Sequence, residues 1–196
     1  MNLKKNNLLI VTLLSLLGSS CSIWQNEKNG GLIMPDGFEA VVVVDSLPGK
    51  ARHIAVNDNG DVYVKANRYV EGGMNYVLRD ENNDGRADII KNFGPNIKEG
   101  AYATSMRLHN GYLYTSSEML VYRYKLDNKL MVPNGQPEFI VIDSGRSREH
   151  DGKPLAFDGK GHIFVPFGAP SDACQVENRV PGSPGRSEER RVGKEC

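Results

Sequence analysis

The sequence predicts an all-β fold, and three observations support this prediction. The chain has 196 residues, of which 39% are hydrophobic, 21 are glycine and 10 are proline. This composition is typical of a globular protein with many turns. Few stretches follow the helical period of about 3.6 residues, and a short alternating pattern recurs three times along the chain. The formal net charge is zero, so the composition gives no electrostatic indication of a nucleic-acid partner.

The N-terminal segment is typical of a secretory signal. Lys4 and Lys5 precede an apolar run from Leu8 to Leu17, and small residues lead from this run to Cys21. The run is short for a transmembrane span. The cysteine after small residues resembles a bacterial lipobox, so we expect residues 1–20 to be a lipoprotein signal peptide. Cys21 would then be lipidated, residues 21–31 would be a polar tether, and the protein would be anchored by lipid in the bacterial cell envelope. An ordinary signal peptide with a nearby cysteine is the alternative.

Three segments align on their glycines. They read "RHIAVNDNGDVYVKA", "TSMRLHNGYLYTSSE" and "KPLAFDGKGHIFVPF". Each has a short apolar stretch, a polar turn that ends in glycine, and an aromatic residue three positions later. The turn glycines are Gly60, Gly111 and Gly161, and the aromatic residues are Tyr63, Tyr114 and Phe164. Asn-Gly supplies the positive φ angles of a tight turn, so each segment predicts a β-hairpin.

Further strands are expected after each of the first two hairpins. "NYVLRD" and "ADIIKNF" follow the first, and "LVYRYKL" and "EFIVIDS" follow the second. Four short strands in each unit of roughly 50 residues are typical of a β-propeller blade. We therefore predict a partial β-propeller over residues 32–185, with two blades and the start of a third. The full-length form would have six blades, and Phe38–Val44 could be the outer strand of the last one.

The last eleven residues form a separate segment. "RSEERRVGKEC", residues 186–196, is rich in charge and has no periodicity. It resembles, codon for codon, the translation of a common sequencing adapter. We therefore expect residues 186–196 to be a sequencing artefact and the natural sequence to continue differently after Gly185. A solvated charged tail is the alternative.

A calcium loop is predicted between two strands of the first unit. In "DENNDGRAD", Asp80, Asn82, Asp84 and Asp88 occupy positions 1, 3, 5 and 9, and Gly85 occupies position 6. This spacing places oxygen ligands around a hard cation, and the glycine allows a sharp turn. Position 12, where an EF-hand has glutamate, is Lys91. An Asx-rich turn without metal is the alternative.

His150 is the candidate catalytic residue. It precedes Gly161 by eleven residues, in the loop that enters the innermost strand of the third blade, where loops converge at one mouth of the channel. Imidazole titrates near neutrality and can accept a hydroxyl proton. Lys153 and Arg52 each lie eight residues before a repeat glycine, so they predict a cationic pair for a ligand that carries carboxylates. Solvated loop charges are the alternative.

Several segments together resemble a known family. "MPDGFEAVVVVDSLPGKARHIAVNDNGDVYVK", "LRDENNDGRADII", "HNGYLYTSSEMLVYRY" and "AFDGKGHIFVPFGAPSDACQ" are similar to the sorbosone dehydrogenase branch of the glucose/sorbosone dehydrogenases. These enzymes are six-bladed propellers associated with pyrroloquinoline quinone (PQQ). The resemblance covers Leu32 to Gly185. It implies PQQ-dependent oxidation of an aldose or sorbosone-type sugar, with Ca²⁺ as a second cofactor and an external electron acceptor or cytochrome as partner.

The resemblance also implies roles for individual residues. In "HDGKPLAFDGKGHIFVPFG", His150 falls on the family's catalytic histidine, which takes the proton of the substrate hydroxyl while hydride passes to the quinone. Beyond what the resemblance implies, we extend the cationic pair of Lys153 and Arg52 to this cofactor and expect the two residues to contact the carboxylates of PQQ. Where soluble glucose dehydrogenases carry an aspartate that orients the histidine, this chain has Ala169, and Asp151 or Asp172 are candidate replacements. Most cofactor contacts are expected in later blades, so we expect this chain to be inactive by itself.

Two other functions remain open at this stage. A non-catalytic envelope propeller that binds glycan or protein ligands is the main alternative. A Ca²⁺-dependent lactonase-like hydrolase is a weaker one, because the loops supply few acidic residues near the channel mouth.

Overall fold

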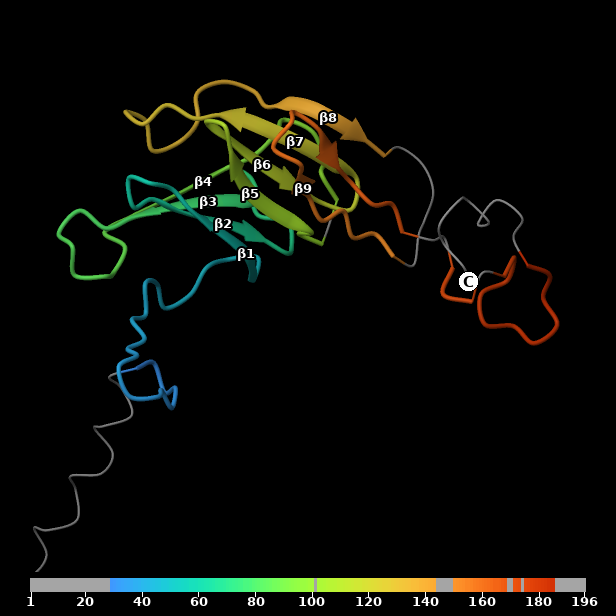
Figure 1. The fold of residues 1–196 in the computed structure, drawn as a ribbon, viewed down its shortest axis with the longest axis horizontal. Helices are drawn as coiled ribbons and strands as arrows, with labels where there is room; N and C mark the ends of the chain where they lie inside the picture. The colour runs from blue at the N-terminus through green and yellow to red at the C-terminus, as the bar shows by residue number, and fades with distance from the viewer. Residues whose placement is uncertain (1–28, 101, 144–149, 169–170, 174, 186–196) are drawn as a thin grey trace, which may run out of the picture. The chain divides into compact units, whose positions relative to one another are not determined.

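The computed structural model describes residues 29–100, 102–143, 150–168, 171–173 and 175–185 (Figure 1). In this part of the chain there is no helix and every strand pairing is antiparallel. The predicted all-β class is therefore confirmed. The chain divides into two units, residues 1–43 and 44–196, and all strands belong to the second. Among the described residues, no helix has the length and apolarity needed to cross a membrane.

Two four-stranded sheets follow each other along the chain, and each is a simple meander. The first has the order β1-β2-β3-β4 and the second β5-β6-β7-β8. The first comprises β1 (Ala51–Val56), β2 (Val62–Ala66), β3 (Asn75–Arg79) and β4 (Ile89–Phe93). The second comprises β5 (Ser105–His109), β6 (Tyr112–Ser116), β7 (Leu120–Lys125) and β8 (Glu138–Ile142). The two-stranded hairpin of β9 (Ala156–Phe157) and β10 (Ile163–Phe164) comes third. All ten strands lie in segments that the sequence predicts as strands.

The turns of the first two hairpins differ in length, and this shifts their register by one residue. In the second sheet Asn110 and Gly111 alone join the strands, both with positive φ (48° and 75°), as a type I′ turn requires. In the first sheet a longer loop closes through a bond from the Asn57 amide to the Asp61 carbonyl. Tyr63 consequently pairs with Ala55, whereas its repeat equivalent Tyr114 pairs with Arg107.

A shared core joins the two four-stranded sheets. The first sheet contributes Tyr63, Val77 and Phe93, and the second contributes Met106, Leu113, Leu120, Tyr122 and Tyr124. The ring of Phe93 meets both Tyr63 and Tyr124 edge to face, at centroid distances of 6.4 and 5.2 Å, a favoured aromatic geometry. Strands β1 and β5 also touch each other. The two sheets therefore stack through one shared apolar cluster.

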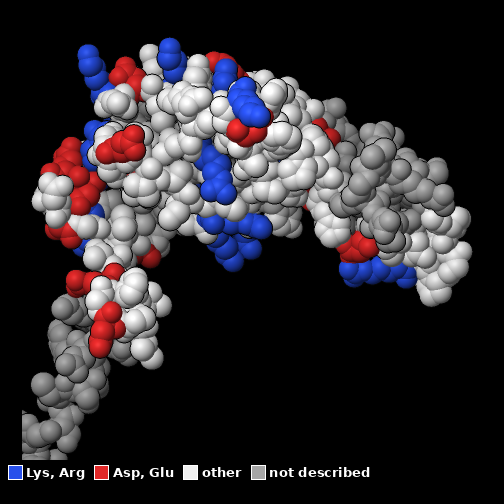
Figure 2. All heavy atoms as spheres, in the orientation of Figure 1, with Lys and Arg blue, Asp and Glu red and all other residues white. Residues whose placement is uncertain are grey.

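The opposite face of the second sheet packs against the third hairpin. Tyr114 and Val121 are buried there with Leu155, and Phe157 and Ile163 pack against them. The three repeats thus stack in chain order, as Figure 1 shows. Acidic and basic side chains both occur over the face shown in Figure 2, in agreement with the balanced charge of the sequence.

Phe38–Val44 does not form the strand that its apolar sequence predicts. Phe38 and Val41 are largely exposed, and the described part of the chain offers no sheet edge that pairs with them. A strand needs a neighbour to satisfy its backbone groups. The apolar pattern alone is therefore not sufficient here.

Candidate functional site

Three of the candidate site residues, His150, Lys153 and Arg52, lie near one edge of the sheets, which we call the Arg52 edge. At this edge β1, β3, β5 and β7 begin, whereas β2, β4, β6 and β8 end. Lys153 lies just before β9, and its carbonyl accepts a 2.7 Å hydrogen bond from Ser116 at the end of β6. The meander order therefore gathers the segments of three repeats at one edge.

His150 forms a pair with an aspartate at the C-terminal end of the described chain. His150 Nε2 lies 2.7 Å from Asp172 Oδ1, and the second oxygen of Asp172 accepts a bond from Arg179. The His150 side chain is 55% exposed and that of Asp172 22%. Asn178 holds the Asp172 segment by accepting the Asp172 amide at 3.0 Å. Of the two replacements considered for the aspartate missing at position 169, the structure therefore brings Asp172 to the histidine.

Glycine is required where the chain passes His150 again. A Cβ atom at Gly168 would collide with the backbone of His150. The segment after β10 and the segment before β9 consequently lie in direct contact. This close approach keeps His150 and Asp172 on adjacent pieces of backbone.

Lys153 is buried rather than presented to a ligand. Its side chain is 1% exposed, and its Nζ lies 3.2 Å from Asp143 Oδ2. The same ammonium donates to the carbonyl oxygens of Glu118 and Asp151. These contacts already compensate its charge, so an incoming carboxylate would have to displace Asp143. A role toward PQQ stays a prediction, but the contacts favour a structural role for Lys153.

Arg52 is exposed and has a different set of partners. Its Nη1 donates to Asn67 Oδ1 at 3.1 Å. The next residue, His53, has a buried Nε2 with no hydrogen-bond partner in the described part of the chain. Burial lowers the pKa of His53 below 6.5, and the charges of Arg52 and Arg107 lower it further, against a bond with the Ala103 backbone. Arg52 and Arg107 therefore create a positive environment around β1 and β5.

The predicted calcium loop is folded by its own hydrogen bonds. Asp80 accepts the amides of Asn83 and Gly85, both at 2.7 Å. Asn82 and Asp84 each accept the amide two residues later, at 2.9 and 2.8 Å. Asp88 reaches back across the loop to the amide of Glu81 at 2.7 Å.

These bonds leave both interpretations of the loop open. They are those of successive Asx turns, and the residues at positions 1, 3, 5 and 9 all lie in the loop between β3 and β4. Each carboxylate oxygen has a second lone pair that can bind a cation. Among the described residues no three His, Cys, Asp or Glu side chains gather as metal ligands, so Asp80, Asp84 and Asp88 do not converge on one point in this structure. The donor set fits Ca²⁺ in kind, and calcium binding stays a prediction.

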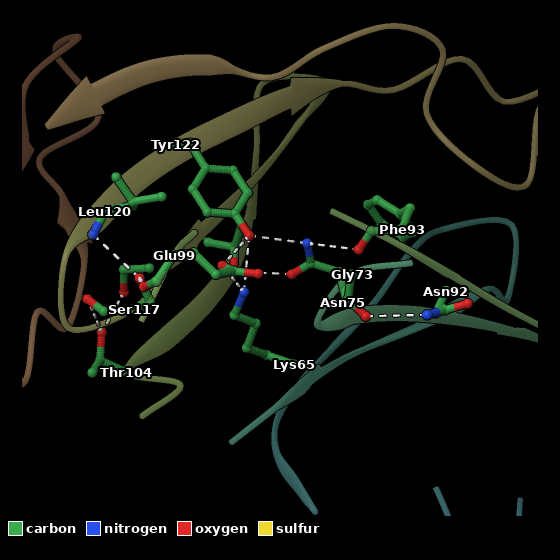
Figure 3. A network of polar contacts seen from close by, with 12 residues as sticks. Lys65, Gly73, Asn75, Asn92, Phe93, Glu99, Thr104, Ser117, Leu120 and Tyr122 are labelled. Carbon is green, nitrogen blue, oxygen red and sulfur yellow. Dashed lines mark hydrogen bonds and ion pairs between the residues drawn. The ribbon is translucent and has the colours of Figure 1, made fainter. Parts of the chain in front are cut away.

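A buried polar network lies between the two sheets and was not predicted from the sequence. Lys65 Nζ lies 2.5 Å from Glu99 Oε2 and donates to Tyr122 Oη at 2.8 Å. The Tyr122 hydroxyl donates to the same Glu99 oxygen at 2.6 Å and accepts a bond from Asn75 Nδ2 at 3.0 Å. Lys65, Asn75 and Tyr122 are fully buried, and Glu99 is 5% exposed. Figure 3 shows these four side chains pointing toward one another.

Burial dominates the electrostatics of this network. It lowers the pKa of Lys65 below 10.5, while the Glu99 carboxylate opposes this shift. It also raises the pKa of Tyr122 well above 10, and Glu99 raises it further. A charged pair in this environment is stable only while both partners are present. One signal was available in the sequence: alternation in "VYVKA" places Lys65 on the same face as the core residue Tyr63.

A hollow of about 750 Å³ opens at the same edge. It lies between the β2–β3 loop and the β4–β5 connection, and Tyr69, Gly73, Met74, Ile97 and Glu99 contribute to its lining. Tyr69 is 76% exposed. The Arg52 edge therefore offers a concave surface beside the buried network.

Some predicted features lie outside the described residues. They are the signal segment 1–20, the lipidation site Cys21, the tether up to residue 28, Ala169, and the C-terminal segment 186–196. Comparisons with protein-family models, with curated proteins and with solved structures found no match for this chain.

Proposed function

We propose that this chain is part of a β-propeller that oxidises an aldose or a sorbosone-type sugar with PQQ. The observation that carries the proposal is the pair of His150 and Asp172, with 2.7 Å between Nε2 and Oδ1. A histidine oriented by a carboxylate is the usual arrangement of a general base. The stacked meanders and the resemblance of residues 32–185 to sorbosone dehydrogenases support the same assignment.

The geometry indicates which nitrogen atom of His150 would act. When neutral His150 carries its proton on Nε2, this proton is donated to Asp172 and Nδ1 keeps a free lone pair. Nδ1 would then take the proton of the substrate hydroxyl. Arg179 holds the other oxygen of Asp172, so the carboxylate cannot rotate away from the ring without breaking an ion pair. PQQ, when bound, would supply the quinone that accepts the hydride.

The described residues fit PQQ only in part. The exposed guanidinium of Arg52 is able to bind a carboxylate in a bidentate manner. Lys153 is committed to Asp143 and to backbone carbonyls. Of the two predicted contacts, Arg52 is therefore the better placed. Asp80, Asn82, Asp84 and Asp88 would hold Ca²⁺, and the envelope location with a lipid on Cys21 remains part of the proposal.

The test is dye reduction with aldoses in the presence of PQQ and Ca²⁺, on the protein encoded by the complete reading frame. We expect His150→Ala to lower the rate by at least about a hundredfold, since general-base catalysis contributes about 10²–10⁴. The matched control is His162→Ala, because His162 also pairs with an aspartate, Asp158, at 2.5 Å but lies in the β9–β10 turn. The control should retain activity.

Two results would overturn the proposal. An unchanged rate for His150→Ala would show that His150 is not the general base. Absence of any reduction by the intact protein would favour the alternative, a non-catalytic propeller that binds glycan or protein ligands in the envelope.

A further inference from the structure

The hollow at the Arg52 edge has a buried floor and an apolar rim. Met74 and Glu99 contribute to its lining and are 1% and 5% exposed. Tyr69 and Ile97 also line it, and they are 76% and 45% exposed. The volume of the hollow is about 750 Å³, and small-molecule sites in proteins measure about 300–1,000 Å³. The hollow therefore has the size of a small-molecule site, with large apolar side chains at its mouth.

The β2–β3 loop forms one wall of the hollow and is held by hydrogen bonds. The side chain of Asn92 donates to the carbonyl oxygens of Glu71 and Gly73, at 2.6 and 3.2 Å, and Figure 3 shows the second bond. A Cβ atom at Gly73 would lie 2.1 Å from the carbonyl carbon of Phe93. Only glycine therefore allows this loop to approach the end of β4 so closely.

The connection between β4 and β5 forms the other wall and is held in a similar way. The Asn96 amide donates to the side-chain oxygen of Gln136 at 3.3 Å. The Ser117 hydroxyl donates to the Glu99 carbonyl. Both walls are therefore fixed by contacts within the chain, and such preorganisation lowers the entropy that is lost when a ligand binds.

Glu99 keeps one free acceptor atom at the hollow. Its Oε2 accepts both bonds of the buried network, from Lys65 and from Tyr122. In the described part of the chain Oε1 has no hydrogen-bond partner, and it is not one of the polar atoms sealed from solvent. Because Glu99 lines the hollow, Oε1 is the acceptor that remains for a molecule bound there.

The charges around the hollow favour a neutral ligand. The Lys65 ammonium compensates the Glu99 carboxylate, and Lys98 is the only other charged side chain among the described residues of the lining. A cationic ligand would therefore approach two ammonium groups, and an anionic ligand would approach the carboxylate. Tyr69 and Ile97 provide apolar surface instead. These features together favour a neutral molecule with an apolar ring and a hydrogen-bond donor.

We propose that this hollow binds a neutral phenolic compound, whose hydroxyl group donates to Glu99 Oε1 and whose ring packs against Tyr69 and Ile97. A phenol combines an aromatic ring with one donor, and it is uncharged at pH 7 because its pKa is about 10. Its ring can form edge-to-face or offset contacts with Tyr69. The inference does not depend on sugar oxidation, because neither His150 nor Arg52 is among the described residues that line the hollow.

The test titrates the 196-residue chain with three probes and follows its backbone amide signals by NMR. The probes are phenol, anisole, in which a methyl group replaces the donor proton, and benzylamine, which carries a positive charge. We expect phenol to shift the amide signals of Gly73 and Ile97. Anisole leaves the acceptor unpaired and benzylamine meets two ammonium groups, so each should bind about tenfold more weakly or worse.

Variants locate the site and test the acceptor. Tyr69→Ala should weaken phenol binding about fivefold, because it removes the aromatic contact. Tyr102→Ala is the matched control, since Tyr102 is also exposed but does not line the hollow. Lys65→Met with Glu99→Gln removes the carboxylate without leaving a lone buried charge. A neutral amide oxygen accepts a weaker bond than a carboxylate, so this double variant should reduce the preference for phenol over anisole.

Several results would overturn the proposal. They are no binding of phenol, equal binding of anisole, and tighter binding of benzylamine. An equal loss of phenol binding in Tyr69→Ala and Tyr102→Ala would do the same, as would shifts confined to residues outside the β2–β3 loop and the β4–β5 connection. The comparison of the three probes uses the unmodified chain, so it decides the question even if the double variant does not fold.

Discussion

Removal of the Glu99 carboxylate should destabilise the protein strongly. It compensates the ammonium of Lys65, which is fully buried between the sheets. Glu99→Gln leaves that charge without its counterion, and breaking a buried pair in this way costs about 3–5 kcal/mol. We expect a loss of this size in the free energy of unfolding, measured with urea at pH 7.

A double variant separates the charge from the packing around it. Lys65→Met with Glu99→Gln removes both charges and keeps the apolar length of the lysine side chain. Replacing a buried pair by apolar groups is often close to neutral, so the double variant should recover most of the lost stability. A double variant as unstable as Glu99→Gln alone would show that the ion pair is not the cause.

The lowered pKa of Asp61 makes the free energy of unfolding depend on pH. Its side chain is 1% exposed, and Arg79 donates to both of its oxygens at 2.7 Å. Burial alone would raise the pKa of Asp61, but the bonds from Arg79 and Asn59 outweigh it and lower the pKa below 3.8. Because the folded state prefers the charged form, this stabilisation is complete above the unfolded pKa of 3.8 and disappears as the pH falls through the lower folded value.

We therefore expect Asp61→Asn to cost about 2 kcal/mol at pH 7 and clearly less at pH 2.5. The measurement is urea unfolding at both pH values. Asp58→Asn, an exposed change in the same turn, is the control and should have little effect. A cost that stays the same at both pH values would mean that the ionised carboxylate is not responsible.

At the scale of elements, the loop between β3 and β4 has two interpretations, a calcium site and an Asx-rich turn without metal, and a binding experiment distinguishes them. We expect Ca²⁺ to bind the chain in a calorimetric titration, and Asp80→Asn to weaken binding by about tenfold or more, since ligand charge sets affinity in such loops. Glu81→Gln removes the same charge at position 2, which is not a ligand position. Equal losses in both variants would indicate diffuse attraction, and no binding at all would establish the Asx-rich turn.

The strands themselves were predictable, because each one depends on local alternation between turn glycines. Tyr63 and Tyr114 identify only one of the two buried faces of their strands, because the residues that alternate with them are buried as well. Phe38–Val44 shows the limit of this reasoning, because an apolar run becomes a strand only where an edge pairs with it. The one-residue register shift between the hairpins came from the loop after Val56, which the repeat pattern does not contain.

The site was less predictable than the strands, because its contacts join distant segments. Lys65 and Tyr122 are 57 residues apart, and their network depends on how two sheets stack. Asp172 was one of two candidates beside His150, and only the path of the chain past Gly168 distinguishes them. The burial of Lys153 likewise follows from Asp143, which the spacing to Gly161 does not reveal.

At the scale of the whole molecule, the two four-stranded sheets should open together. Leu113 of β6 is fully buried in the core that both sheets share. Leu113→Ala leaves a cavity there and should cost about 2–5 kcal/mol. Hydrogen exchange should then quicken in β2 and β3 as well as in β6 and β7, because loss of the common layer weakens both sheets.

Val121→Ala provides the matched control from the same sheet. Val121 is equally buried, but it faces the third hairpin rather than the first sheet. Its replacement should speed exchange around β9 and β10 and in the second sheet, and leave β2 and β3 nearly unchanged. If Leu113→Ala also spared β2 and β3, the sheets would be independent units. Faster hydrogen exchange in both sheets after Leu113→Ala, but not after Val121→Ala, would show that the shared core joins the two four-stranded sheets into one cooperative structure.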